Sequence, residues 1–151
     1  MEIYNEISVQ RPIEKVFEFL RNFENMPKWN YYVLEVTKIT EGDIIKGSVF
    51  HQVRKKDSQR YQIVELDFPK IIAVKTLPPE RNLTMRFELS SVGNTTLIKD
   101  HAHIDVPWII SLFIKNKIQA TVMENLQKLK TLLESGKVIL QDGRTQTLQG
   151  I

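Results

Sequence analysis

Hydrophobic and polar residues alternate over residues 1–10, with Ile3, Ile7 and Val9 on one parity and Glu2, Glu6 and Ser8 on the other. A period of two with β-branched residues is typical of a half-buried strand. Pro12 ends this pattern, and proline is favoured in the first turn of a helix. The spacing of apolar residues over 13–20 therefore predicts a short amphipathic helix, and we expect a second helical segment over residues 22–29.

From residue 31 to residue 106 the pattern is that of strands separated by turns. Turn residues such as Gly42, Pro78-Pro79 and Gly93 recur along this stretch and divide it into six segments. The clearest segment, residues 83–89, alternates apolar and polar side chains without interruption. Together with the first strand this predicts seven strands, all joined closely enough to pair antiparallel.

After Pro107 the period changes to that of a helix, which we expect to end at Ser135-Gly136. The apolar stripe of this long helix needs a partner, and the sheet is the only element large enough to provide one. The stripe consists of Ile118, Val122, Leu126, Leu129 and Leu133, with Leu132 beside it. We expect residues 137–151 to be a loose tail, with pairing to a sheet edge or to a second subunit as alternatives.

Composition narrows the class of protein. The chain has 151 residues, 42% hydrophobic and 26% charged, which suits one globular domain. The net charge of +3 is spread evenly, and the cluster at residues 54–56 looks like a solvated hairpin tip, so we expect no nucleic-acid partner. The chain has no cysteine, which excludes disulfides and fits a reducing compartment. With no signal-like start and no apolar run longer than residues 106–114, we expect a cytoplasmic protein without a transmembrane segment.

Five short motifs, in order, resemble the START-like (SRPBCC) superfamily and its polyketide cyclase/dehydrase-like families. A strand passes through a proline into a helix with Val-Phe at residues 7–17, and Pro27-Lys28-Trp29 resembles the family's Pro-x-Trp segment. Residues 63–69, Ile-Val-Glu-Leu-Asp-Phe-Pro, are similar to the family's strand end Val-x-Glu-x-Asp-Pro-Pro, and Phe68 departs from this pattern because it stands where a first proline is common. Gly93-Asn94-Thr95 and the helix at 126–134 complete the resemblance, which spans residues 3–135.

The resemblance implies an α+β helix-grip fold. In this fold a curved seven-stranded antiparallel sheet wraps around the C-terminal helix, and two short helices follow the first strand. We therefore expect one ligand-binding domain over residues 1–136 and a tail over 137–151. An internal cavity would lie between sheet and helix, open near the hairpin tips and the helix start. Superfamily members include enzymes, transport proteins and chaperone-partner domains, so the fold alone implies no reaction.

We expect this cavity to hold a small hydrophobic or amphipathic molecule, without a cofactor. The side chains expected to line the cavity or its mouth are mostly apolar. They are Trp29, Leu83, Met85, Phe87, Leu89, Ile98, Asp100, Ile104, Trp108, Phe113, Val122 and Leu126. A further hypothesis is that the chain binds no ligand and is a protein-interaction module. Such a module would have a collapsed cavity and a large exposed apolar patch.

An enzyme similar to polyketide cyclases is the second hypothesis. Asp100 shares the parity of apolar neighbours on the last strand, and burial there would raise its pKa toward that of a general base, unless a bulge leaves it in solvent. His51, between Val49 and Val53, is either a second possible base or a hydrogen-bonded structural histidine. Tyr61 or Arg86 would stabilise an enolate, although Arg86 is expected on the outer face and Tyr61 also suits a simple wall position.

Two further features have alternative explanations. His101, His103 and Asp105 share one strand face, but strand neighbours about 7 Å apart are too widely spaced for one ion, so we expect no metal site. The segment 108–114 is apolar on nearly all sides. It would face the core and also a cavity ligand, a membrane surface or a second subunit, as in a homodimer, or it would be wholly buried.

Overall fold

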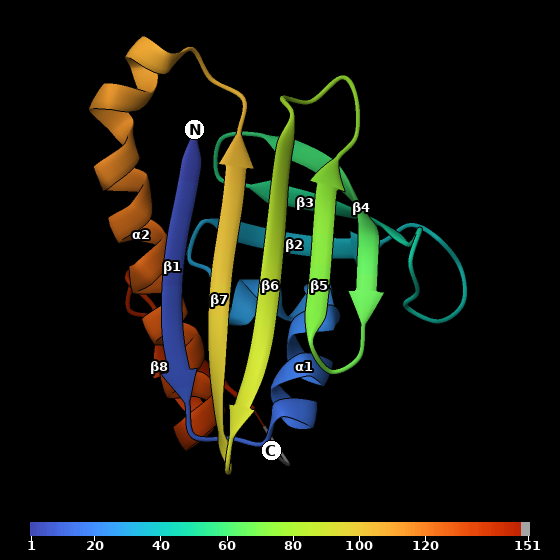
Figure 1. The fold of residues 1–151 in the computed structure, drawn as a ribbon, viewed down its shortest axis with the longest axis vertical. Helices are drawn as coiled ribbons and strands as arrows, with labels where there is room; N and C mark the ends of the chain where they lie inside the picture. The colour runs from blue at the N-terminus through green and yellow to red at the C-terminus, as the bar shows by residue number, and fades with distance from the viewer. Residues whose placement is uncertain (149–151) are drawn as a thin grey trace.

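The fold is described from a computed structural model, which covers residues 1–148 (Figure 1). Strand β1 (Glu2–Val9) leads into helix α1 (Ile13–Arg21) and the 3-10 helix η1 (Phe23–Lys28). Six strands follow: β2 (Val33–Lys38), β3 (Val49–Arg54), β4 (Ser58–Asp67), β5 (Ile71–Thr76), β6 (Leu83–Val92) and β7 (Thr95–Ile104). Helix α2 (Trp108–Ser135) and a hairpin of β8 (Lys137–Ile139) and β9 (Thr145–Thr147) complete the chain.

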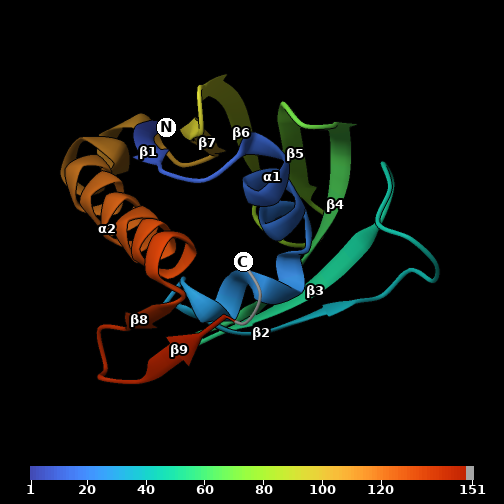
Figure 2. The same ribbon diagram turned by 90° about the horizontal axis from the view of Figure 1, so that it is seen from below.

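The first seven strands form one antiparallel sheet in the order β1-β7-β6-β5-β4-β3-β2. Figure 2 shows that the sheet curls into a half-barrel, with α2 along its β1 edge and α1 and η1 on the concave side. Register shifts between Val33 and Glu35 on β2 and between Ile63 and Glu65 on β4 mark bulges, which increase the local twist of a sheet. The α+β helix-grip fold with seven strands is confirmed.

Helix α2 buries only its C-terminal half. Leu126, Leu129, Leu132 and Leu133 are at most 1% exposed, whereas the residues before Asn125 are half-buried or exposed. The space opposite these leucines is filled by aromatic rings from α1, η1 and β3, namely Phe17, Phe23 and Phe50. One half of the concave face is therefore densely packed, and the half beneath the start of α2 is not.

The C-terminal segment corrects the expectation of a loose tail, as far as residue 148. Gly136 takes a left-handed conformation with φ 77°, and its amide donates to the Leu132 carbonyl over 2.8 Å, which ends α2 and turns the chain back. Val138 and Leu140 are 4% and 2% exposed and belong to the core. In the sequence, only the alternation of Val138 and Leu140 indicated a buried strand here. A pattern of three residues is too short to predict one.

Candidate functional site

A partly enclosed cavity of about 220 Å³ lies between the concave face of the sheet and the N-terminal half of α2. Its apolar wall is formed by Ile3, Met26, Trp29, Val74, Leu83, Met85, Phe87, Ala102, Ile104, Ile118 and Val122. Its polar wall is formed by Asn30, Gln52, Arg54, Gln59, Tyr61, Thr76, Asp100 and Asn125. The cavity is smaller than the ~300–1,000 Å³ of typical ligand pockets. More polar residues line it than the sequence suggested.

Asp100 is the buried carboxyl group of this cavity. The register of β7 pairs it with Asn5 on β1 and Phe87 on β6, so that it shares the concave face with Ile98 and Ala102. Asp100 is 7% exposed, and its Oδ1 makes no hydrogen bond within residues 1–148. Burial raises the pKa of Asp100 to about 7, and the neighbouring His101 opposes this shift only in part.

Tyr61 brings a phenol to the same cavity from β4. It is 4% exposed, and its ring packs against two others, that of Phe23 edge-on with 5.3 Å between ring centres and that of Phe50 stacked with 5.8 Å between ring centres. These contacts hold the ring rigidly, and the hydroxyl makes no hydrogen bond within the described part of the chain. Burial raises the pKa of the Tyr61 hydroxyl, so the phenol stays a neutral donor at any physiological pH.

A third polar group is an amide network that sequence reasoning missed. Asn125 of α2 donates from Nδ2 to the Asn30 Oδ1 over 3.3 Å, and its own Oδ1 accepts from Gln141 Nε2 over 3.3 Å. The hairpin after α2 thus fixes an amide in the cavity wall. Asn125 lies beside leucines on the buried stripe of α2. A buried polar side chain needs hydrogen-bond partners, and this was the one feature of the sequence that indicated the network.

His51 and Arg86 do not reach the cavity. On β3 the concave positions are Phe50, Gln52 and Arg54, so His51 lies on the other face, opposite Thr37 and Arg60. The first of the two alternatives for His51, a base inside the cavity, is therefore wrong, because Val49 and Val53 beside it also face outward.

Arg86 lies on the outer face, as its parity indicated. Its Nη1 is 2.5 Å from Glu65 Oε2, and its Nε is 2.9 Å from Glu88 Oε1. The hydrogen bonds that Arg86 donates to Glu65 and, second, to Glu88 raise the pKa of Arg86. The structure thus brings Asp100 and Tyr61 to one cavity and leaves the other two catalytic candidates outside it.

The expected ligand contacts divide into three groups. Seven of the twelve residues line the cavity: Trp29, Leu83, Met85, Phe87, Asp100, Ile104 and Val122. Leu89, Ile98 and Leu126 are buried in the packed core instead. Trp108 and Phe113 are 73% and 81% exposed and do not line the cavity.

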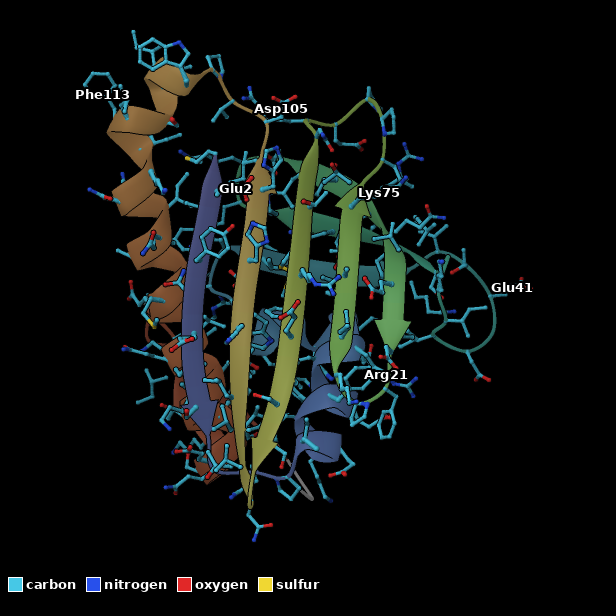
Figure 3. The ribbon with its side chains drawn as sticks, in the orientation of Figure 1. Glu2, Arg21, Glu41, Lys75, Asp105 and Phe113 are labelled. Carbon is cyan, nitrogen blue, oxygen red and sulfur yellow. The ribbon has the colours of Figure 1, made fainter. Side chains whose placement is uncertain are left out.

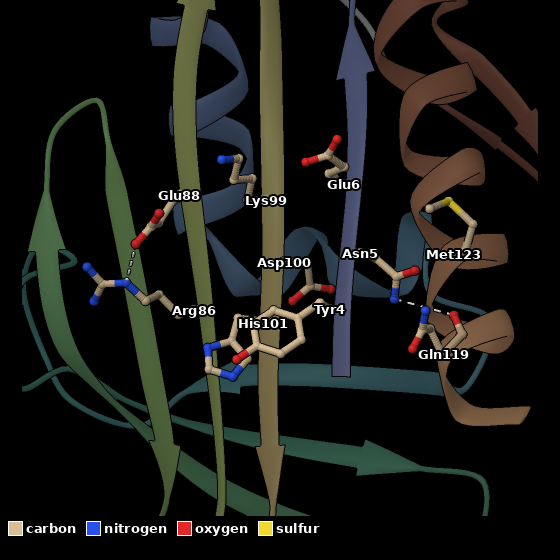
Figure 4. Close-up of a pocket in the computed structure, with 10 residues that line it drawn as sticks. All are labelled: Tyr4, Asn5, Glu6, Arg86, Glu88, Lys99, Asp100, His101, Gln119 and Met123. Carbon is tan, nitrogen blue, oxygen red and sulfur yellow. Dashed lines mark hydrogen bonds and ion pairs between the residues drawn. The ribbon is translucent and has the colours of Figure 1, made fainter. Parts of the chain in front are cut away.

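The outer face of β1 and β7 carries a charged surface instead of a site (Figure 4). The Glu2 carboxylate hydrogen-bonds both His101 and His103, which lowers the Glu2 pKa. Tyr4 stacks on His101 with 4.3 Å between ring centres. The depression here, about 560 Å³, is open, and two of its charged groups, Arg86 and Glu88, pair with each other. Among residues 1–148 no group of three or more histidine, aspartate or glutamate side chains could hold a metal ion.

A match to one known family identifies the class of protein. The model of one family, described as polyketide cyclase / dehydrase and lipid transport, matches residues 1–134. The chain belongs to this family. A search of the curated proteins found no match.

Solved structures of other proteins show the same fold. The solution structure of the Aha1 dimer from Colwellia psychrerythraea aligns with a TM-score of 0.73 at 16% identity, over 90% of this chain and 98% of that one. A protein of Nitrosospira multiformis aligns at 0.69 and 16%, over 89% and 97%. A protein of Deinococcus radiodurans aligns at 0.67 and 13%, over 90% and 99%. At such identities the likeness concerns the fold alone.

The raised pKa of Asp100 predicts a specific pH dependence of stability. Between about pH 4 and pH 7 the folded protein keeps a proton on Asp100 that the unfolded chain has released. The free energy of unfolding should therefore fall as the pH rises through this range, by on the order of 4 kcal/mol. In Asp100→Asn this component should be missing, so the variant gains stability relative to the parent as the pH rises.

Urea unfolding of both proteins at several pH values between 4 and 8 measures this difference. The exposed Asp105→Asn is the matched control and should follow the parent at every pH. A constant difference between the parent and Asp100→Asn over this range would contradict a buried, neutral Asp100.

Proposed function

We propose that this domain binds a compact, mainly apolar molecule that carries at least one polar group. The observation that supports this most is a partly enclosed cavity in which Asp100 Oδ1 and the Tyr61 hydroxyl lack hydrogen-bond partners within residues 1–148. Buried polar atoms without partners are unfavourable, and a ligand that supplies a hydrogen bond removes this penalty. The family described as polyketide cyclase / dehydrase and lipid transport is consistent with this function.

The volume of the cavity sets the size of its ligand. An apolar cavity of ~150 Å³ in another protein accommodates benzene. About 220 Å³ suits a molecule of one or two rings and cannot enclose a long acyl chain. Trp29 and Phe87 offer flat apolar contacts to such rings.

The polar wall selects the functional group of the ligand. With a pKa of about 7, Asp100 is present near neutral pH both as an acid and as a carboxylate. The acid donates a hydrogen bond to a carbonyl oxygen, and the carboxylate accepts one from a hydroxyl. Tyr61 provides a donor whose charge does not change. Phenols and ring ketones combine both features, which makes them the ligand class that this cavity suits best.

Filling the cavity should prevent binding. Ala102 is a small lining residue on β7, and Ala102→Leu would add three carbon atoms to a hollow of about 220 Å³. We expect this substitution to weaken the binding of 2-naphthol at least about tenfold, measured by isothermal titration calorimetry. Ala120→Leu, the same change at an exposed position of α2, should leave the affinity unchanged. Equal affinities of Ala102→Leu and the parent, or no heat with the parent, would contradict binding in this cavity.

Catalysis of proton transfer next to a carbonyl is the second candidate function. It is favoured by one observation, a carboxyl group with a pKa near neutrality in the same cavity as a neutral phenol. The Asp100 carboxylate would take the proton from the carbon beside the carbonyl, and Tyr61 would donate a hydrogen bond to the enolate oxygen that forms. Aldol closure or dehydration of a larger substrate would begin with the same step.

Deuterium exchange into 1-indanone tests this step without knowledge of the natural substrate. The parent protein in heavy water should accelerate exchange beside the carbonyl, with a rate that rises with pH to a plateau above about pH 7. Asp100→Asn should lose about 100-fold, since an amide cannot accept the proton. The exposed variant Asp105→Asn is the control. If NMR shows no acceleration by a parent protein that binds the ketone, the enzymatic function is excluded and binding remains.

A further inference from the structure

The first two turns of α2 expose an unusual cluster of apolar side chains, which we call the apolar tip. It consists of Trp108, Ile109, Ile110, Leu112 and Phe113, which are between 44% and 81% exposed. Successive helical residues are ~100° apart, so these five cover more than half of the helix circumference. An isolated exposed leucine is ordinary, but a contiguous group with two aromatic rings marks an interaction surface.

The apolar tip projects beyond the sheet. Figure 1 shows the start of α2 above the N-terminal end of β1, and Figure 3 shows Phe113 pointing away from the sheet. The hydrogen bond of Asn5 to the Gln119 carbonyl, 3.3 Å long, joins α2 to β1 only two turns further on. The core leucines of α2 begin at Leu126. Nothing within residues 1–148 covers the tip.

The charge around the tip is positive. No aspartate or glutamate occurs between residues 106 and 123, although acidic side chains are favoured in the first turn of a helix. Lys115 and Lys117 follow the tip directly and are exposed. The nearest acidic residue is Asp105, and the guanidinium of Arg81 lies beside it, with Nη1 3.3 Å from the Asp105 carbonyl.

We propose that the apolar tip inserts into the surface of a membrane that contains anionic phospholipids. Exposed aromatic and aliphatic side chains next to lysines are the pattern of helices that lie at a bilayer interface. Within residues 1–148 no helix is long and apolar enough to cross a membrane, so the contact is peripheral. The lysines complement phosphate and carboxylate headgroups, whereas a second copy would bring the same positive charge to the contact and no acidic side chain from residues 106–123.

The contact would bring the open end of the cavity to the membrane. The half-buried lining residues Leu83, Ile104 and Ile118 begin β6, end β7 and lie in the third turn of α2, the end of the molecule that carries the tip. A molecule dissolved in the bilayer would thus enter without crossing water. Membrane docking itself does not depend on which molecule the cavity holds.

Vesicle binding by the full chain tests the proposal. Trp108 is 73% exposed and Trp29 is 5% exposed, so a change in tryptophan emission on binding reports on the tip against a constant background. With phosphatidylcholine vesicles containing about one third phosphatidylserine, we expect co-sedimentation and a shift of the emission to shorter wavelength. Binding to phosphatidylcholine alone should be weaker, and salt should weaken binding to the anionic vesicles.

Two variants separate the apolar and the charged contributions. The double substitution Trp108→Ser/Phe113→Ser should lower the partition coefficient at least about tenfold. Lys115→Glu/Lys117→Glu should lower binding to anionic vesicles by more than about tenfold and leave binding to neutral ones nearly unchanged. Val92→Ser, at an equally exposed valine at the tip of the β6–β7 hairpin, is the matched control and should bind like the parent.

Three results would overturn the proposal. The first is no binding of the parent to anionic vesicles. The second is equal binding of the parent and both tip variants. The third is a parent dimer in analytical ultracentrifugation that Trp108→Ser/Phe113→Ser converts to a monomer while vesicles bind neither, which would assign the tip to a second copy. Should the serine variant fail to fold by circular dichroism, the lysine variant, altered only at exposed positions, decides the question.

Discussion

The packing of the C-terminal half of α2 onto the sheet is the interaction on which the other features depend. Leu126, Leu129 and Leu133 close one half of the half-barrel together with the aromatic rings of α1, η1 and β3. Full burial of such side chains contributes roughly 1.5–3 kcal/mol each, which is enough to fix the helix without help from its first half. The first half can therefore diverge from the strands, because the fold does not require its contacts.

The difference in packing between the two halves of α2 has two consequences, one on each side of the helix. On the inner side a hollow remains, and the carboxyl group of Asp100 on β7 is buried in its wall with a raised pKa, because it forms no ion pair within residues 1–148. On the outer side the first two turns project with their apolar side chains uncovered. Ligand cavity and apolar tip are thus two results of one constraint, and a helix packed along its whole length would have neither.

Strand periodicity predicted the seven strands, and the resemblance to a known family implied how they fold. For Asp100, the parity of β7 offered burial among apolar neighbours only as one alternative, beside a bulge that would leave it in solvent. Periodicity failed on β3, where Val49 and Val53 are apolar on the outer face and only Phe50 distinguishes inside from outside. It could not find Asn30, Asn125 or Gln141, because these amides meet only after distant segments pack. Periodicity also could not show that Leu89, Ile98 and Leu126 belong to the packed core and do not line the cavity. It tells which face of an element a residue is on, but not how deep in the half-barrel the residue lies.

A crystal structure of the protein purified without added ligand would test the central claim most directly. The account predicts a hollow of about 220 Å³ between Phe87 and Val122, with the Asp100 carboxyl group in its wall and the start of α2 lifted from the sheet. A sheet in direct contact with α2 from Trp108 onward, with Phe87 and Val122 touching and Asp100 open to solvent, would contradict it.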